Sequence, residues 1–270
     1  YTHTGLSTST TYYYYIKANN TAGTSGESNR ASATTPASAG FTFSSTTTTV
    51  TESGVRGDAQ WFRNEGSTAG STEYYSSAID SEMNVIAFGF TEGDIVGSNL
   101  GSSDWLITKY EPSGNTVWQK QIGSTGLDSP QGGVVVDSND NIYIFGYVKS
   151  IANGAAFDGT PVNHGGNNNT WVLVKYDKDG NKQWTKLSYQ DGVVSDIIIE
   201  GSNLYLLGKT GGGTNTGQTT RIEKYDLNGN LLASRDLTLS WSQNPTPASI
   251  AATSSAVYVS VYRRDSTNPE

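Results

Sequence analysis

Three short segments of the chain combine carboxylate and amide side chains with glycine, and they are the first candidates for cation binding. They read EPSGN at 111–115, DKDGN at 177–181 and DLNGN at 226–230. Asp177, Asp179 and Asn181 lie two residues apart, which is the ligand spacing of a calcium-binding loop. An EF-hand loop needs glycine directly after its third ligand, whereas Gly180 precedes Asn181. The recurrence of the segment favours hairpin turns with glycine at positive φ, so we predict no metal site.

Two further motifs lack the context that their chemistry needs. Gly208–Thr210 matches the end of a phosphate-binding loop, but Asn203 stands where that motif requires glycine. A glycine-rich run follows it in place of the required helix. Arg56–Asp58 spells the integrin-binding tripeptide, and we interpret it as a chance occurrence.

Acidic residues are frequent enough to raise the question of catalysis by paired carboxylates. His164 stands in a loop with Asp158 and without an obvious nucleophile, so we interpret it as a solvated residue. The chain has no cysteine, and His3 lies far from His164, so a zinc site has almost no ligands. We predict no catalytic residue and no cofactor. Four acidic residues occupy recurring positions that favour capping and turn roles: Asp104, Asp128, Asp137 and Asp191.

The segment at 148–170, VKSIANGAAFDGTPVNHGGNNNT, is the strongest candidate for a ligand surface. It is the longest of three equivalent connections in the internal repeat described below. Extra length in one loop of a repeat protein maps to one face, frequently a binding face. Its candidate ligand-binding residues are Phe157, Asp158, Asn163 and His164. The sequence leaves open the alternative of a surface insertion without a binding role.

Composition predicts an all-β protein and excludes two classes of partner. Glycine, serine, threonine and asparagine, which favour turns and strands, are abundant, with 31 glycines among 270 residues. The net charge of −8 argues against a nucleic-acid partner, since phosphate binding needs clustered lysine and arginine. No segment approaches the roughly 20 apolar residues of a membrane-spanning helix. The absence of cysteine is compatible with export from the cell.

Residues 1–36 predict two strands joined by a polar turn. Alternation from Tyr12 to Ala18 indicates the first strand, and a second runs through 29–35. Asparagine, glycine and serine fill the intervening turn, NNTAGTSGES. A generic β-hairpin explains this pattern by itself.

The run GL…T-x-Y-x-x-x-I-x-A-x-N-x-x-G-x-S in this segment resembles the last third of a fibronectin type III domain. In that family a tyrosine hydroxyl bonds back to the nearby backbone, and Leu6 and Tyr12 match this tyrosine corner. The resemblance implies that the earlier strands lie upstream, so we expect the chain to be a fragment of a larger protein. Residues 37–53 are expected to be a linker or a closing strand. The matches to the loop between the family's last two strands are Asn20, Gly23 and Ser25.

From residue 54 the chain repeats itself in units of about 50 residues, each with four short strands. The first strands are expected at 76–80, 133–137, 196–200 and 249–253. The second are expected at 84–90, 141–147, 203–209 and 256–262. The third are expected at 104–115, 170–181 and 220–230. The fourth strands carry Trp61, Trp118 and Trp184 at matching positions, followed by Ala233.

These units resemble the bacterial β-propeller repeat family with seven-bladed-type repeats, whose consensus includes K-Y-D-x-x-G-N-x-x-W. The best matches are WQKQIGSTGLDSPQGGVVVDSNDNIYIFGY and WVLVKYDKDGNKQW. The last units drift, with Ser260 expected in place of Gly146 and Gly208, and Arg221 in place of Trp105 and Trp171. The expected fold is therefore a set of four-stranded antiparallel blades over 54–270, preceded by a partial fibronectin-III-like β-sandwich.

The blade count leaves two arrangements open. In one, the chain holds part of a propeller of about six to eight blades. In the other, residues 41–63 supply the missing strands, place Phe41–Val50 beside Val257–Tyr262 and close a four-bladed ring. We favour the larger propeller.

The function expected from these features is non-catalytic binding or scaffolding on a secreted or cell-surface bacterial protein. Its ligand would be a polysaccharide or a surface protein. One alternative is a carbohydrate-active lyase or hydrolase with carboxylates converging in an axial pocket. The other is a structural spacer or filament subunit whose blade edges pair between chains.

Overall fold

A computed structural model of the 270-residue chain shows an all-β protein, with no helix among the residues that it describes. Contacts divide the chain into two units, Tyr1–Phe62 and Arg63–Glu270. No segment of the described chain forms a helix with the length and apolar character needed to cross a membrane. The described residues are 7, 10–14, 17, 19–20, 23–25, 27–28, 30–34, 41–44, 49–52, 65–149, 155–162, 169–188, 191–211, 219–237 and 245–263.

The described residues of the first unit form three short antiparallel strand pairs. Strand β1 (Thr11–Tyr14) pairs with β4 (Ala31–Thr34), which confirms the two predicted strands. Between them, β2 (Asn19–Asn20) pairs with β3 (Gly23–Thr24). The backbone N–H of Ser7 donates a hydrogen bond of 2.8 Å to the hydroxyl of Tyr12, which is the bond expected of a tyrosine corner.

The third pair of this unit is the hairpin of β5 (Phe41–Ser44) and β6 (Thr49–Glu52). It forms a separate two-stranded sheet. The pairing of residues 41–50 with 256–262 that would close a four-bladed ring stays a prediction, as does the larger propeller that we favour.

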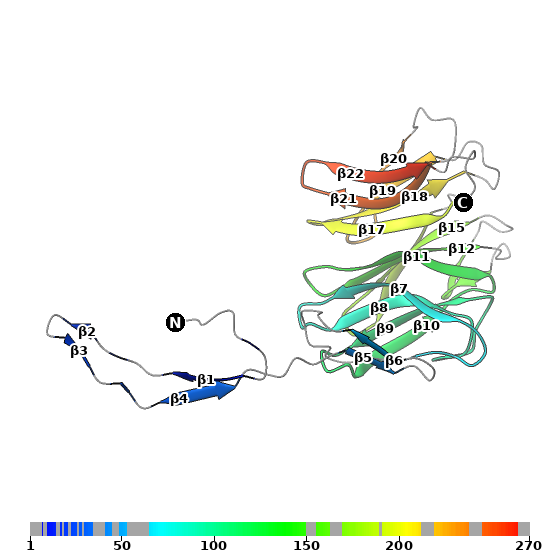
Figure 1. Ribbon diagram of the computed structural model, residues 1–270. Helices are drawn as coiled ribbons and strands as arrows, with labels where there is room; N and C mark the ends of the chain where they lie inside the picture. The colour runs from blue at the N-terminus through cyan, green and yellow to red at the C-terminus, as the bar shows by residue number, and fades with distance from the viewer. Residues whose placement is uncertain are drawn as a thin grey trace. The chain divides into compact units, whose positions relative to one another are not determined.

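The second unit contains four successive antiparallel sheets, which we call sheets I to IV (Figure 1). Sheet I comprises β7 (Thr72–Ile79), β8 (Val85–Thr91), β9 (Asp104–Tyr110) and β10 (Thr116–Ile122). Sheet II comprises β11 (Leu127–Val136), β12 (Ile142–Lys149), β15 (Thr170–Tyr176) and β16 (Lys182–Ser188). Sheet III comprises β17 (Val194–Glu200), β18 (Asn203–Thr210), β19 (Thr219–Asp226) and β20 (Leu231–Leu237). Sheet IV has β21 (Pro245–Ala252) and β22 (Val257–Arg263).

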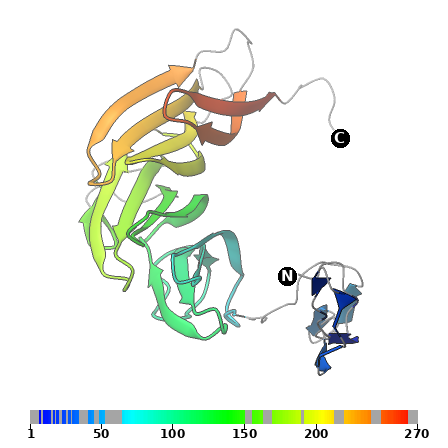
Figure 2. The same cartoon turned by 90° about the vertical axis from the view of Figure 1, so that its left-hand side faces the viewer.

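Each complete sheet is a meander in which strands pair in chain order, as the repeat predicted. The first strands β7, β11, β17 and β21 pack one against the next. Figure 2 shows the four sheets following one another along an arc. The only further pair in this unit's described residues is β13 (Ala156–Phe157) with β14 (Thr160–Pro161), which lies within the connection from β12 to β15.

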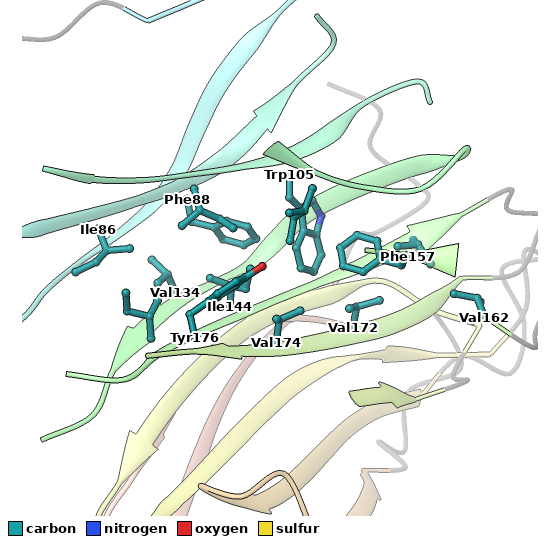
Figure 3. Packing of buried hydrophobic residues seen from close by; sticks show 14 residues of the cluster. Ile86, Phe88, Trp105, Val134, Ile144, Phe157, Val162, Val172, Val174 and Tyr176 are labelled. Atoms are coloured by element: carbon teal, nitrogen blue, oxygen red, sulfur yellow. The ribbon is translucent and has the colours of Figure 1, made fainter. Parts of the chain in front are cut away.

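Apolar side chains on both faces of the middle strands create a core between each pair of sheets. Strands β8, β12 and β18 are buried along most of their length. Between sheets I and II, Phe88, Trp105 and Ile144 belong to one fully buried cluster (Figure 3). A second cluster joins sheets II and III, and a smaller one joins III and IV. A sheet that buries both faces needs a neighbour on each side, which explains the stacking.

Glycines on the second strands make room for tryptophans of the preceding sheet. A Cβ on Gly146 would overlap the indole of Trp105, and a Cβ on Gly208 would overlap that of Trp171. This contact requires glycine on one sheet wherever the facing position of the preceding sheet is a tryptophan. It recurs at both of the junctions between complete sheets.

The strand register corrects the sequence alignment of the last units by one residue. Trp105 and Trp171 pair with the residue directly after the glycine of their own sheet, and in sheet III Thr220 takes that place, because it pairs with Lys209. Arg221 instead pairs with Gly208 itself. Likewise Val261, not Ser260, stands at the glycine position, because it borders the bulge of sheet IV as Gly208 does in sheet III. The Trp–Gly pair is thus replaced by Thr220 and Val261 together.

The outer strands of sheets I and II carry two of the predicted tryptophans at equivalent positions, and Trp61 lies outside the described residues. Trp118 pairs with Lys109, Trp184 with Lys175, and Ala233 with Lys224, which confirms the alignment of these residues. Both indoles are partly buried against the cores between sheets.

Candidate functional site

The acidic turns between third and fourth strands are hairpin turns closed by their own carboxylates. In sheet II, Asp177 Oδ1 accepts hydrogen bonds from the backbone N–H groups of Asp179 and Asn181, and Oδ2 accepts one from the Asn181 amide. Gly180 has the positive φ of 81° that the turn prediction requires. Burial acts to raise the pKa of Asp177, but the hydrogen bonds from Asn181 and Asp179 outweigh it, and the pKa lies below its ordinary value.

The same carboxylate-to-asparagine closure recurs at other turns of the unit. It occurs between first and second strands as well, where Asp137 accepts from the backbone and amide of Asn141. The carboxylate oxygens of these turns are thus occupied by donors of the chain itself. The equivalent pairs are Asp80 with Asn84 and Asp226 with Asn230.

These turns also join neighbouring sheets through what we call the lysine–turn contact. Lys109 Nζ of sheet I donates a hydrogen bond of 3.0 Å to the Lys178 carbonyl in the turn of sheet II. Lys175 Nζ of sheet II donates one of 3.1 Å to the Leu227 carbonyl in the turn of sheet III. Each contact uses the lysine of the repeated Lys-Tyr motif and the second residue of the next turn.

The described carboxylates with a raised pKa are Asp104 and Asp128, which meet at the junction of sheets I and II. Both side chains are fully buried. A Cβ on Gly123 would collide with an oxygen of each, so the two carboxylates border the same small space. Asp104 lies at the start of β9, and Asp128 lies at the start of β11.

Donors of the chain hold each of these two carboxylates. Asp104 Oδ2 accepts from the Gln121 side-chain amide at 2.9 Å and from the Leu100 N–H at 3.1 Å. Asp128 accepts from the backbone N–H and the hydroxyl of Ser124, both at 2.6 Å. Both carboxylates therefore fix the loops that surround them.

Burial gives Asp128 the titration range of a general acid or base. Burial raises the pKa of Asp128 to about 7, with a further contribution from the charge of Asp104, although hydrogen bonds from Ser124 oppose the rise. Burial also raises the pKa of Asp104, against the hydrogen bonds from Gln121 and Leu100. A carboxylate that titrates near neutral pH beside a second carboxylate can act as a general acid or base, provided that a substrate can reach it.

The candidate ligand-binding residues divide between the core and the surface. Phe157 on β13 is fully buried, and its ring meets the Trp105 indole edge-on at a centroid distance of 4.8 Å (Figure 3). Asp158 accepts a salt bridge of 2.9 Å from Lys182 on the outer strand of sheet II. Asn163 and His164 lie outside the described residues.

The hairpin around Phe157 is anchored next to the carboxylate pair. The Asp158 N–H donates a hydrogen bond of 3.1 Å to the Gly123 carbonyl, and Gly123 borders both Asp104 and Asp128. Val162 is also fully buried in the core between sheets I and II. The structure thus joins the predicted ligand loop to two acidic residues that the sequence assigned to capping.

The other acidic residues considered for catalysis have local partners. Asp137 accepts a hydrogen bond of 2.9 Å from the Tyr143 hydroxyl in addition to its turn contacts. Asp191 adopts a positive φ of 46° and donates its N–H to the Asn169 carbonyl. Sequence reasoning did not single out Gln121, Ser124 or Gly123. The spacing of four residues from Ser124 to Asp128 was the available signal, since serine and aspartate at such spacing close loops locally.

Among the described residues, no group of three or more histidine, cysteine, aspartate and glutamate side chains could hold a metal ion. No protein-family model matches the chain, and no curated protein matches it either.

Proposed function

We propose that residues 65–263 are consecutive blades of a β-propeller that follows the end of a fibronectin-III-like domain. The module would serve non-catalytic binding or scaffolding on a secreted or cell-surface bacterial protein. Meander sheets whose first strands pack against one another along an arc support the propeller assignment. The hydrogen bond from Ser7 to Tyr12 supports the fibronectin-like assignment.

The anchored hairpin at 155–162 carries the binding proposal. A binding loop needs a rigid base that holds its side chains in place. Phe157 and Val162 are fully buried, and the Asp158 backbone bonds to the neighbouring sheet. The described part of the long connection is therefore held against the core between sheets I and II.

The chemistry of the connection favours a polyhydroxylated or peptide-like ligand. The segment beyond the hairpin, NHGGNNN at 163–169, is rich in amides that both donate and accept hydrogen bonds. It contains no lysine or arginine, so a phosphate ligand does not fit it. We propose a neutral polysaccharide or a surface protein as the partner.

Replacement of residues 163–168 by glycine and serine tests this proposal. The variant and the native chain would be compared for binding on a glycan array and against purified bacterial surface proteins. We expect the native chain to bind and the variant to lose binding. The matched control replaces 212–218, the equivalent connection of sheet III, and should bind as the native chain does. Binding that survives the change at 163–168, or a native chain that binds none of these ligands, would contradict the proposal.

The pair of Asp104 and Asp128 favours a second candidate function, a carbohydrate-active enzyme. Its pKa pattern suits acid–base catalysis, but both side chains are fully buried and occupied by local donors. Polysaccharide cleavage that is lost in Asp128→Asn, while the variant keeps the circular dichroism spectrum of the native chain, would support the enzyme over the binding module. The absence of new reducing ends or unsaturated products from the polysaccharides that the chain binds would argue against it.

A further inference from the structure

Two hydrogen-bond donors in sheet III repeat an arrangement that in sheet II binds a turn of the next sheet. In sheet II, the Leu227 carbonyl accepts a hydrogen bond of 3.1 Å from Lys175 Nζ. It also lies 3.3 Å from the hydroxyl oxygen of Tyr143, whose single proton is shared between this carbonyl and Asp137 at 2.9 Å. The Lys175 ammonium also lies 5.1 Å from the centre of the Tyr143 ring. One turn carbonyl thus lies within hydrogen-bond distance of a lysine and a tyrosine that contact each other.

Sheet III carries the same lysine and tyrosine in the same arrangement. Lys224 lies 5.4 Å from the centre of the Tyr205 ring, and the two residues pair directly across β18 and β19. Lys175 and Tyr143 pair in the same way in sheet II. Within the described residues, neither Lys224 Nζ nor the Tyr205 hydroxyl has a carbonyl acceptor.

Strands β20 and β22 are exposed to solvent. They border the position at which a turn would contact Lys224 and Tyr205. Strand β20 is exposed along almost its whole length, whereas β10 and β16 are partly covered by the next sheet. The difference lies at 233–236, which are exposed, whereas the equivalent residues 118–121 and 184–187 are half-buried. On β22, Tyr258 is 61% exposed, and β22 pairs with β21 alone among the described strands. Exposed strand edges of this kind accept an added strand.

We propose that this region is a docking site for a β-hairpin whose turn has the sequence acidic-x-x-Gly-Asn. The first strand of the hairpin pairs antiparallel with β22, as β15 pairs with β12 and β19 with β18. The carbonyl of the second turn residue accepts from Lys224 and Tyr205. The outer strand of the hairpin covers the exposed face of β20. This site is separate from the ligand loop, so the proposal does not depend on glycan binding.

A synthetic peptide with the sequence of residues 170–188 provides a probe, since it contains one such hairpin and its turn. Binding to the full 270-residue chain would be measured by titration calorimetry. We expect saturable binding that weakens about tenfold in Lys224→Met, because that variant loses one charged hydrogen bond. Tyr205→Phe should weaken it to a smaller extent. Lys149→Met removes an exposed lysine of sheet II and should leave the affinity unchanged.

Two controls separate docking from other causes of binding. A scrambled peptide of the same composition has the same positive charge and tests for attraction to the acidic chain. Circular dichroism and melting curves verify that each variant is folded. A native peptide that binds no better than the scrambled one, or an affinity that neither Lys224→Met nor Tyr205→Phe changes, would overturn the proposal. A chain that sediments as a dimer and becomes monomeric in Lys224→Met would replace the hairpin with a second copy as the occupant.

Discussion

The indole of Trp171 lies directly over Gly208 of the next sheet, so that a Cβ on Gly208 would stand 2.7 Å from Cη2 of the ring. Trp105 and Gly146 repeat this relationship one sheet earlier. At the following junction, Thr220 and Val261 occupy the two positions. At the first two junctions a tryptophan faces a glycine, and at the third two side chains of moderate size take their places. The combined side-chain volume of the two positions thus stays similar.

Because the two side chains share one space, substitutions at Thr220 and Val261 should have non-additive effects on the free energy of unfolding. Thr220→Trp should destabilise the chain by about 1–3 kcal/mol, because the indole would overlap the Val261 side chain. Val261→Gly should also destabilise it, because it leaves a void and a flexible backbone. The double variant Thr220→Trp/Val261→Gly should recover most of the loss. Free energies of unfolding from urea titration measure the coupling, and strictly additive losses would show that the two side chains do not meet.

A second prediction concerns Trp184 on the outer strand of sheet II. Its ring lies 5.9 Å from that of Tyr143, and a Cβ on Gly229 would lie 3.1 Å from it. The ring is partly rather than fully buried, so Trp184→Ala should cost about 2 kcal/mol, below the roughly 3–5 kcal/mol of a buried tryptophan. Chemical denaturation measures the change. The control is Leu232→Ala on the exposed strand β20, which should cost less than about 0.5 kcal/mol.

Much of the fold was predictable because the repeat appears four times. Second strands have the pattern Asn-x-x-x-x-Gly because their middle residues are buried. Turns end in Gly-Asn because the backbone there adopts a positive φ. The predicted strands of sheets I to III were confirmed, as were the positions of Trp118, Trp184 and Ala233. Two residues of the last units were misplaced by one. Thr220, not Arg221, lies four residues before its lysine as Trp105 and Trp171 do, and Val261, not Ser260, is equivalent to Gly208; the strand pairing shows both.

The candidate site was predictable only in part, because its contacts join residues from separate sheets. Sequence length singled out the connection containing Phe157 and Asp158. It did not reveal that Phe157 would be buried against Trp105, because an aromatic residue in a polar loop can equally contact solvent. Asp104 and Asp128 are 24 positions apart, and their proximity depends on how sheets I and II stack.

The pKa of Asp128 predicts a stability that rises as the pH falls. Because the folded pKa of about 7 exceeds the ordinary value, the folded state keeps this proton over a range in which the unfolded chain has lost it. Lowering the pH from 8 toward 5 should therefore stabilise the chain, by at most about 1.4 kcal/mol per pH unit for one proton. Asp177 and Asp226 have lowered pKa values, so their contribution is lost only at more acidic pH.

The variant Asp128→Asn isolates this contribution. It should melt at a higher temperature than the native chain at pH 8, because no buried charge forms beside Asp104. Its melting temperature should also change less between pH 8 and pH 5. Thermal melts at four pH values across this range measure both effects. A native chain that is most stable at pH 8, with the same profile in Asp128→Asn, would show that Asp128 is ionised in the folded state.

The last prediction concerns the buried ion pair of Lys109 and Asp80, whose Nζ and Oδ2 atoms lie 2.8 Å apart in sheet I. Both side chains are almost fully buried, and Asp80 also accepts hydrogen bonds from Asn84. Lys109→Met leaves the Asp80 charge buried without its cation and should cost about 3 kcal/mol. The double variant Lys109→Met/Asp80→Asn removes both charges and should recover most of this loss, since replacement of a buried pair by neutral groups is frequently tolerated. The loss in Lys109→Met should be smaller at pH 4 than at pH 7, because Asp80 can then take up a proton instead of remaining charged. Urea titrations of the native chain and the two variants at both pH values measure these differences. A cost below about 1 kcal/mol for Lys109→Met at pH 7 would show that water reaches Asp80 and replaces the lysine.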